Sequence, residues 1–136
     1  MNHGFYIRLL MIASIFGVAG VSLGAFGAHF LKDRLAVEEL DILKTGVLYL
    51  FIHTLALMVV VLLGKSGSSS RMLKSAGLFF VFGITLFSGS LFLIATRFLT
   101  GLSPAYFGFL TPVGGLFFIA GWISLFFYAF SLRNIT

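Results

Sequence analysis

Four long apolar stretches without Lys, Arg, Asp or Glu alternate with short polar connections along this chain. They cover residues 9–30, 45–64, 75–96 and 112–132, the last divided from a preceding apolar segment at Pro112. A helix needs about 20 predominantly apolar residues to cross the hydrocarbon core of a bilayer, and each stretch reaches about that length. The apolar runs are continuous and lack the alternation with period two that membrane strands show. The pattern therefore predicts an all-α membrane protein, an up-down bundle of four transmembrane helices.

The connections carry signals of their own. Residues 33–43 hold all the acidic residues of the chain, and apolar residues recur among them at helical spacing. We expect a short interfacial helix at about 33–43, either separate from the second span or continuous with it. Before the fourth span, Thr111 is the expected N-cap and Pro112 the first helical residue. The connection at 64–74 has the Gly/Ser-rich composition of a short flexible loop.

The composition restricts the class of protein further. Hydrophobic residues make up 60% of the 136 residues, charged residues make up 10%, and the mean hydropathy is +1.12. Because a soluble domain carries roughly 25% charged residues, this composition excludes a soluble enzyme, a disordered chain and a nucleic-acid binder. The absence of cysteine excludes disulfides and iron–sulfur clusters. We expect a single four-helix transmembrane domain over residues 1–136, with the lipid bilayer as its surroundings.

The basic residues indicate an orientation. They stand one to three at a time between the apolar runs and form no patch for nucleic acid, despite the net charge of +5. The face that holds both termini would carry five of them: Arg8, Lys65, Arg71, Lys74 and Arg133. The opposite face would carry four: Lys32, Arg34, Lys44 and Arg97. The positive-inside rule favours a multi-pass protein of the plasma (inner) membrane with both termini in the cytoplasm, and the small margin leaves dual insertion open.

Small residues form a stripe along the first predicted span. They recur at spacings of four and three and so share one helical face: Ala13, Gly17, Gly20, Gly24 and Gly27. In lipid, such stripes let helices approach closely, and Gly121 offers a similar contact in the fourth span. The stripe can serve packing within the monomer or a dimer face, and both remain open.

His53 is the clearest ionisable residue at membrane depth, because it lies well inside the second span. At about 1.5 Å per residue, Ser88 and Trp122 fall near its level on other helices. An imidazole and an indole N–H both need hydrogen-bond partners there, and hydroxyl groups of the third span are the expected source. The candidate polar core or pathway consists of His53, Thr85, Ser88, Ser90 and Trp122.

Two interpretations of this polar set stay open. In one, His53 is a satisfied interior residue that fixes helix register. In the other, it relays protons or contacts a ligand. A metal site has little support, because His29 ends its span and no third ligand joins the two histidines. No acid lies within a span, so we name no catalytic residue and expect neither a metal nor a cofactor.

Four segments together resemble a known family. They are LGAFGAHFL at 23–31, TGVLYLFIHTLAL at 45–57, LFSGSLF at 86–92 and TPVGGLFFIAGW at 111–122. The chain is similar in these segments to the small inner-membrane protein family that includes bacterial YgdD and YwdK and small eukaryotic TMEM relatives. The resemblance covers nearly the whole chain and implies a four-helix, multi-pass plasma-membrane protein of no established activity.

The resemblance carries over motif positions but no catalytic or binding role. These positions are Gly24, Gly27, His29, Tyr49, His53, Ser88, Gly89, Ser90, Thr111, Pro112, Gly114, Gly115, Gly121 and Trp122. The chain departs from the family at one place. Family members often carry polar residues around this tyrosine, whereas Leu48 and Leu50 flank Tyr49 here. Any ligand contact that the polar cluster makes in the family is therefore weakened in this chain.

From these observations we expect a small structural or accessory membrane protein and not an enzyme. It would act through helix–helix association, as a homo-oligomer or with another membrane protein. The alternative is a minimal oligomeric permease or channel for a small solute or a proton, with His53 and Ser88 near the pathway. A pathway requires a polar cavity that reaches His53, whereas an accessory protein predicts a dry, packed interior there.

Overall fold

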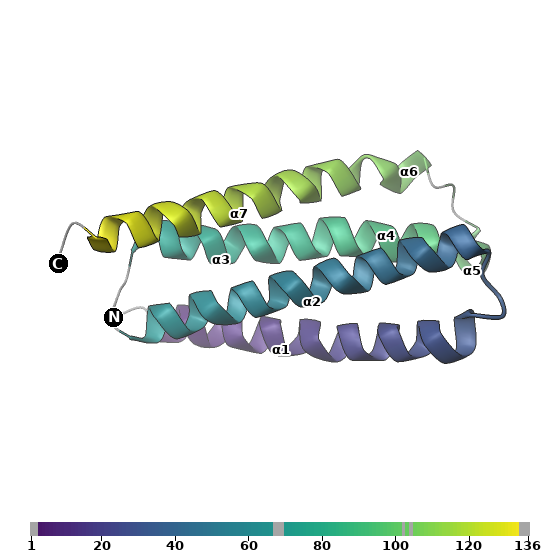
Figure 1. The fold of residues 1–136 in the computed structure, drawn as a ribbon, viewed down its shortest axis with the longest axis horizontal. Coiled ribbons are helices and arrows are strands. Elements are labelled where there is room, and N and C mark those ends of the chain that lie inside the picture. Colours follow the sequence, from purple (N-terminus) through teal and green to yellow (C-terminus); the bar gives the residue numbers. More distant parts are fainter. Residues whose placement is uncertain (1–2, 67–69, 102, 104, 134–136) are drawn as a thin grey trace.

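The computed structural model describes residues 3–66, 70–101, 103 and 105–133, and this part of the chain forms helices and turns without strands. Four antiparallel rods run the length of the molecule, and α1 begins at the same end at which α7 finishes (Figure 1). Each rod is long and apolar enough to cross a membrane. The prediction of an all-α bundle with four crossings is confirmed.

The rods contain nine helical elements within the described residues. In chain order they are α1 (His3–Phe26), the π-helical segment η1 (Gly27–Leu31), α2 (Val37–Lys65), α3 (Arg71–Gly83), the π-helical segment η2 (Ile84–Ser88), α4 (Gly89–Ala95), α5 (Arg97–Thr100), α6 (Ala105–Gly108) and α7 (Leu110–Arg133). The first rod joins α1 to η1, and the third joins α3, η2 and α4. The short helices α5 and α6 connect the third rod to α7.

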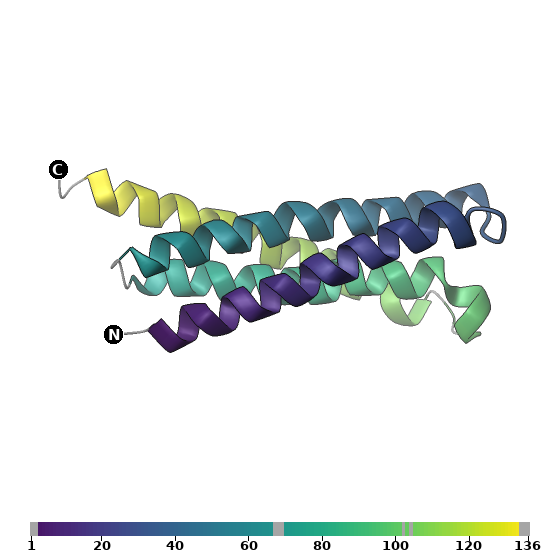
Figure 2. The same cartoon turned by 90° about the horizontal axis from the view of Figure 1, so that it is seen from below.

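The rods pack in the order in which they follow one another along the chain. In Figure 1, α7 lies above the third rod, α2 lies below it and α1 lies lowest; α1 packs mainly against α2, and α3 packs against α7. Figure 2 shows α1 crossing the other rods obliquely. The core contains buried residues of all four rods, among them Leu9, Leu57, Phe80 and Phe118. The outward faces of α1 and α7 are apolar and therefore suited to lipid.

Three helices begin earlier than the apolar pattern predicts. The first starts at His3 instead of residue 9, the second at Val37 instead of 45, and the third at Arg71 instead of 75. Helical hydrogen bonding continues past the end of an apolar run into the membrane interface, where charged side chains of the first turn reach water.

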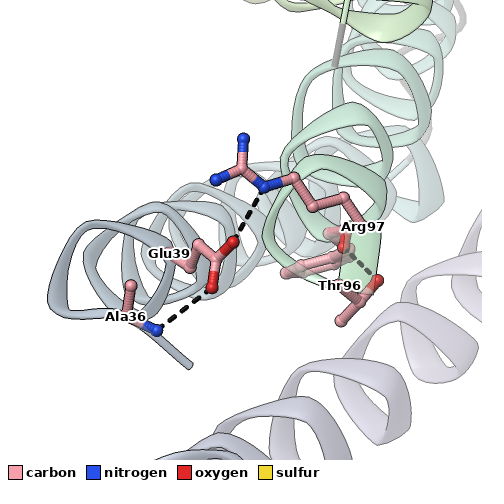
Figure 3. Close-up of polar contacts among 5 residues, drawn as sticks. Ala36, Glu39, Thr96 and Arg97 are labelled. Carbon is pink, nitrogen blue, oxygen red and sulfur yellow. Dashed lines mark hydrogen bonds and ion pairs between the residues drawn. The ribbon is translucent and has the colours of Figure 1, made fainter. Parts of the chain in front are cut away.

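The expectation of a separate interfacial helix at 33–43 is wrong, and the helical part of this segment is continuous with the second span. Residues 32–35 form a turn, Ala36 is extended with ψ 155°, and the following residues are the first turns of α2. The cause is a cap: one oxygen of the Glu39 carboxylate accepts the Ala36 N–H at 3.1 Å. Its other oxygen accepts the Arg97 Nε–H at 2.8 Å, which ties the start of α2 to α5 (Figure 3).

The fourth rod also begins differently. Its main helix, α7, starts at Leu110, so Thr111 is not the N-cap and Pro112 lies within the first turn. A proline is tolerated there because first-turn N–H groups have no partner inside the helix. In the connection at 64–74, Ser70 caps α3 by accepting the Met72 N–H at 3.2 Å. The middle of the expected flexible loop, residues 67–69, lies outside the described residues.

Candidate functional site

His53 lies in the centre of the bundle, surrounded by aromatic rings. It belongs to α2 and is only 5% exposed. Its imidazole stacks on Phe118 of α7 with ring centroids 3.4 Å apart and planes 10° from parallel. Tyr49, one turn earlier on α2, and Phe80 of α3 complete the surroundings, with centroids at 5.8 and 5.9 Å. Three rods therefore meet at this side chain.

Both ring nitrogens of His53 have partners within the chain. Nδ1 lies 2.8 Å from the backbone carbonyl oxygen of Tyr49, which can only accept a hydrogen bond. Nε2 lies 3.3 Å from the indole Nε1 of Trp122, which can only donate one. These two contacts assign the proton to Nδ1 and leave Nε2 as an acceptor. A neutral imidazole therefore has a hydrogen-bond partner at each nitrogen. A second proton on Nε2 would point at the indole N–H of Trp122.

The histidine explains why a tryptophan lies so deep in a membrane helix. The Trp122 side chain is 46% exposed on the outer face of α7, and its ring stands edge-on to Phe80, with centroids 5.3 Å apart. An indole N–H in hydrocarbon needs an acceptor, because lipid tails supply none. His53 is that acceptor, so the two residues form one hydrogen-bonded pair between α2 and α7.

The hydroxyl residues of the third rod do not supply these partners. Ser90 is buried and lies 2.7 Å from the Thr111 hydroxyl on α7, while it donates to the carbonyl oxygen of Phe87 at 2.9 Å. Thr85 is exposed and donates to the Val81 carbonyl oxygen of its own rod at 2.9 Å. The structure thus brings His53 and Trp122 together, and it separates Thr85 and Ser90 from them.

Two buried hydroxyl groups near the middle of the bundle have no hydrogen-bond partner among the residues that the structure describes. Ser88, at the end of η2, is fully buried, and Thr54, next to His53 on α2, is 2% exposed. Sequence reasoning named Ser88 but missed Thr54. It also missed Phe118, although a spacing of four places Phe118 and Trp122 on one face of α7.

The glycines let side chains of neighbouring rods enter the helix surfaces. A Cβ at Gly121 would lie 2.6 Å from the Phe80 ring, and one at Gly83 would overlap the Phe118 ring. In α1, a Cβ at Gly20 would lie 2.7 Å from the Leu50 side chain. The glycines at the level of His53 therefore make room for the aromatic residues that surround it.

The stripe of α1 is used unevenly inside the monomer. A Cβ at Gly27 would lie 2.6 Å from Leu43, whereas one at Gly24 would make an ordinary contact of 3.6 Å with Val47. At Gly17 nothing lies within 4 Å. Packing against α2 thus accounts for Gly20 and Gly27 but not for Gly17.

A groove between the first two rods lies away from His53. It has a volume of about 570 Å³ and is lined by α1, η1 and α2 near the end opposite the first residues of α1. No residue of the His53 ring cluster lines it. Among the described residues, no group of three His, Asp or Glu side chains could hold a metal ion.

We expect Trp122→Phe and His53→Leu each to lower the free energy of unfolding by about 1–2 kcal/mol, because Trp122→Phe leaves the buried Nε2 of His53, and His53→Leu leaves the indole N–H of Trp122, without its hydrogen-bond partner. Since the two groups bond to each other, the double variant should cost less than the sum, with a coupling energy of about 1 kcal/mol. Unfolding by sodium dodecyl sulfate in mixed micelles would give the free energy of unfolding of the wild type, the two single variants and the double variant. Strict additivity would show that the two rings do not interact.

The comparisons with known proteins agree with the architecture. A family described as "protein of unknown function (DUF423)" matches residues 23–115, a range that includes His53 and Ser88 and ends before Trp122. The "UPF0382 membrane protein YwdK" of Bacillus subtilis is 36% identical over 116 residues, which cover 85% of this chain and 90% of that protein. The "UPF0382 inner membrane protein YgdD" of Escherichia coli K12 is 37% identical over 118 residues, covering 84% and 82%. No solved structure matches.

Proposed function

This chain belongs to the DUF423 family of UPF0382 membrane proteins, and we propose that it is a structural or accessory protein of the plasma (inner) membrane that acts through association of its helices. The observation that carries the proposal is the closed polar centre. Both nitrogens of His53 are bonded within the chain, and the groove between the first two rods does not reach it. A transport pathway needs polar groups that can exchange partners with a solute. A ring held between two fixed partners suits a structural role better.

The proposal excludes catalysis. The acidic residues of the chain are Asp33, Glu38, Glu39 and Asp41, all at one end of the bundle. No carboxylate is therefore available beside His53 to orient it as a general base.

The outward face of α1 is the surface that we assign to association. This helix lies at the edge of the bundle and packs mainly against α2. Its membrane-spanning part is the least buried of the four candidate spans. A shallow hollow on it is lined by Ser14, Ile15, Val18 and Ala19. Small residues at such a surface allow a partner helix to approach closely, and the space beside Gly17 is unfilled. The partner would be a second copy or another membrane protein.

Photo-crosslinking in native membranes tests this role. A photoreactive residue at Ile15 or Val18, which are 66% and 69% exposed, should give discrete protein adducts that mass spectrometry identifies. The matched control is a photoreactive residue at Phe126, which is 63% exposed on α7. Adducts to lipid alone at every position, together with a monomeric protein in native membranes, would contradict the proposal.

One observation favours the second candidate, a minimal oligomeric permease or channel. The hydroxyl groups of Ser88 and Thr54 are buried at membrane depth and have no partner within the described part of the chain, and unsatisfied polar groups there are costly unless they serve a transported species. In proteoliposomes, a proton or solute flux that disappears in His53→Leu while the helical content persists would favour this candidate. Equal flux through the wild type, His53→Leu and protein-free vesicles would favour the structural role.

A further inference from the structure

The groove between the first two rods combines an apolar interior with a basic mouth. Its walls come from α1 and η1 on one side and from α2 on the other: Leu23, Gly24, Gly27, Ala28, Leu40, Leu43, Val47, Leu48 and Phe51. Lys32 and Lys44 are its charged lining residues. A volume of about 570 Å³ lies within the range of roughly 300–1,000 Å³ of sites that hold small molecules.

Each of the two lysines lies at the end of an apolar segment. Lys44 immediately precedes the uncharged stretch 45–64, and Lys32 follows η1 directly in the chain. From Lys44 the groove continues along α2 to Phe51, a distance of about 10 Å at 1.5 Å per residue. The lysines therefore lie where the bilayer places phosphate groups, and the apolar walls lie where it places acyl chains.

The lysines are available to an anion. Among the described residues, no carboxylate lies within ion-pair distance of Lys32. Lys44 lies 3.1 Å from Asp41, but both side chains are about two-thirds exposed, and such a pair contributes little and exchanges readily. Glu39 is engaged by Arg97 and by the Ala36 N–H, so it does not compete for the groove lysines.

We propose that this groove binds one anionic glycerophospholipid, with its phosphate between Lys32 and Lys44 and an acyl chain along the wall formed by α2. Charge complementarity at the mouth selects the headgroup, and the apolar walls hold the chain. The alternative occupant, a second copy of this chain, fits less well. A two-fold axis through the groove would bring the lysines of both copies together at one depth, where like charges repel.

Lipid retention by the purified full-length protein tests the headgroup contact. Native mass spectrometry would count bound phosphatidylglycerol and phosphatidylcholine with the same acyl chains. We expect about twenty-five-fold weaker retention of phosphatidylglycerol in Lys32→Gln/Lys44→Gln, because each lysine near an anionic lipid contributes about a factor of five. The matched control is Lys65→Gln/Lys74→Gln, which removes the same charge from the opposite end of the bundle. Equal retention by both double variants, or equal retention of both lipids by the wild type, would overturn the proposal.

A second pair of variants tests the acyl-chain contact. Gly24→Leu fills the groove, because a Cβ at Gly24 meets only Val47 at an ordinary 3.6 Å. Gly4→Leu adds the same side chain to the same helix, outside the groove and where a Cβ would meet nothing within 4 Å. Gly24→Leu should lose phosphatidylglycerol and Gly4→Leu should retain it. If glycerol phosphate competed as strongly as the whole lipid, the acyl-chain contact would be overturned. If Gly24→Leu instead lost a dimer that the wild type forms, the groove would be assigned to a second copy of this chain.

A measurement on the wild type tests the proposal without depending on whether the variants fold. Phosphatidylglycerol with a diazirine on its acyl chain should crosslink to Leu48 or Phe51, which line the groove beyond Lys44. Adducts spread evenly over the lipid-facing positions of α7, such as Ile119, would overturn the proposal without any substitution in the protein.

Discussion

Phe118→Ala is expected to lower the free energy of unfolding by about 3–5 kcal/mol, the range for removing a buried phenylalanine. Phe118 is 4% exposed; its ring stacks on His53 and lies 5.4 Å, between centroids, from that of Phe87. It also occupies the space left by Gly83. The substitution therefore opens a cavity at the point where three rods meet, and unfolding by sodium dodecyl sulfate in mixed micelles measures the loss.

Phe126→Ala on the same helix is the matched control. This residue is 63% exposed, so its ring faces lipid in the folded bundle and in the separated helices alike. We expect a change of less than about 1 kcal/mol. Equal losses in the two variants would show that α7 does not present Phe118 to the core.

The second large effect is expected for Gly114→Ala, which should lower the free energy of unfolding by about 3 kcal/mol. A Cβ at Gly114 would overlap the backbone nitrogen of Phe87 in η2. Backbone cannot rotate away as a side chain can, so α7 must shift from the third rod and lose packing along its length. Thermal unfolding of the purified protein would report the change.

Gly115→Ala provides a control one residue further along. A Cβ there would lie 3.9 Å from the Phe87 ring, an ordinary contact, and alanine is the better helix former by about 1 kcal/mol. We expect this variant to be as stable as the wild type or slightly more stable. If Gly114→Ala unfolded at the same temperature as Gly115→Ala, the result would contradict the close contact between α7 and η2.

His53 shows why the depth of a residue, counted from the ends of the apolar runs, can indicate the wrong neighbours on other helices. Counting from residue 45 placed Ser88 level with His53. In the structure α2 begins at Val37, two turns earlier, whereas α4 ends at Ala95, close to the predicted end. In the structure the ring of the third rod beside His53 is that of Phe80, whose centroid lies 5.9 Å from that of the imidazole.

The π-helical segment η2 adds a second source of error. Residues of an α-helix advance by about 100° each, so an extra residue in one turn changes which face the following side chains occupy. Thr85 lies in this segment and is exposed, and Ser88 ends it and is buried. A period of 3.6 residues cannot anticipate this local change, because π-helical turns have no sequence signal comparable with an apolar run.

The sequence by itself determined that the chain crosses the membrane four times as helices, since the cost of an unbonded backbone in hydrocarbon leaves an apolar run of this length no other structure. It also placed His53 and Trp122 among the polar residues at membrane depth. Only the tertiary structure decided that these two bond to each other, and that a Cβ at Gly114 would meet backbone while one at Gly17 would meet nothing within 4 Å. Such pairings depend on the rotation and tilt of each rod against its neighbours, which close packing of side chains selects and hydrophobic periodicity does not specify.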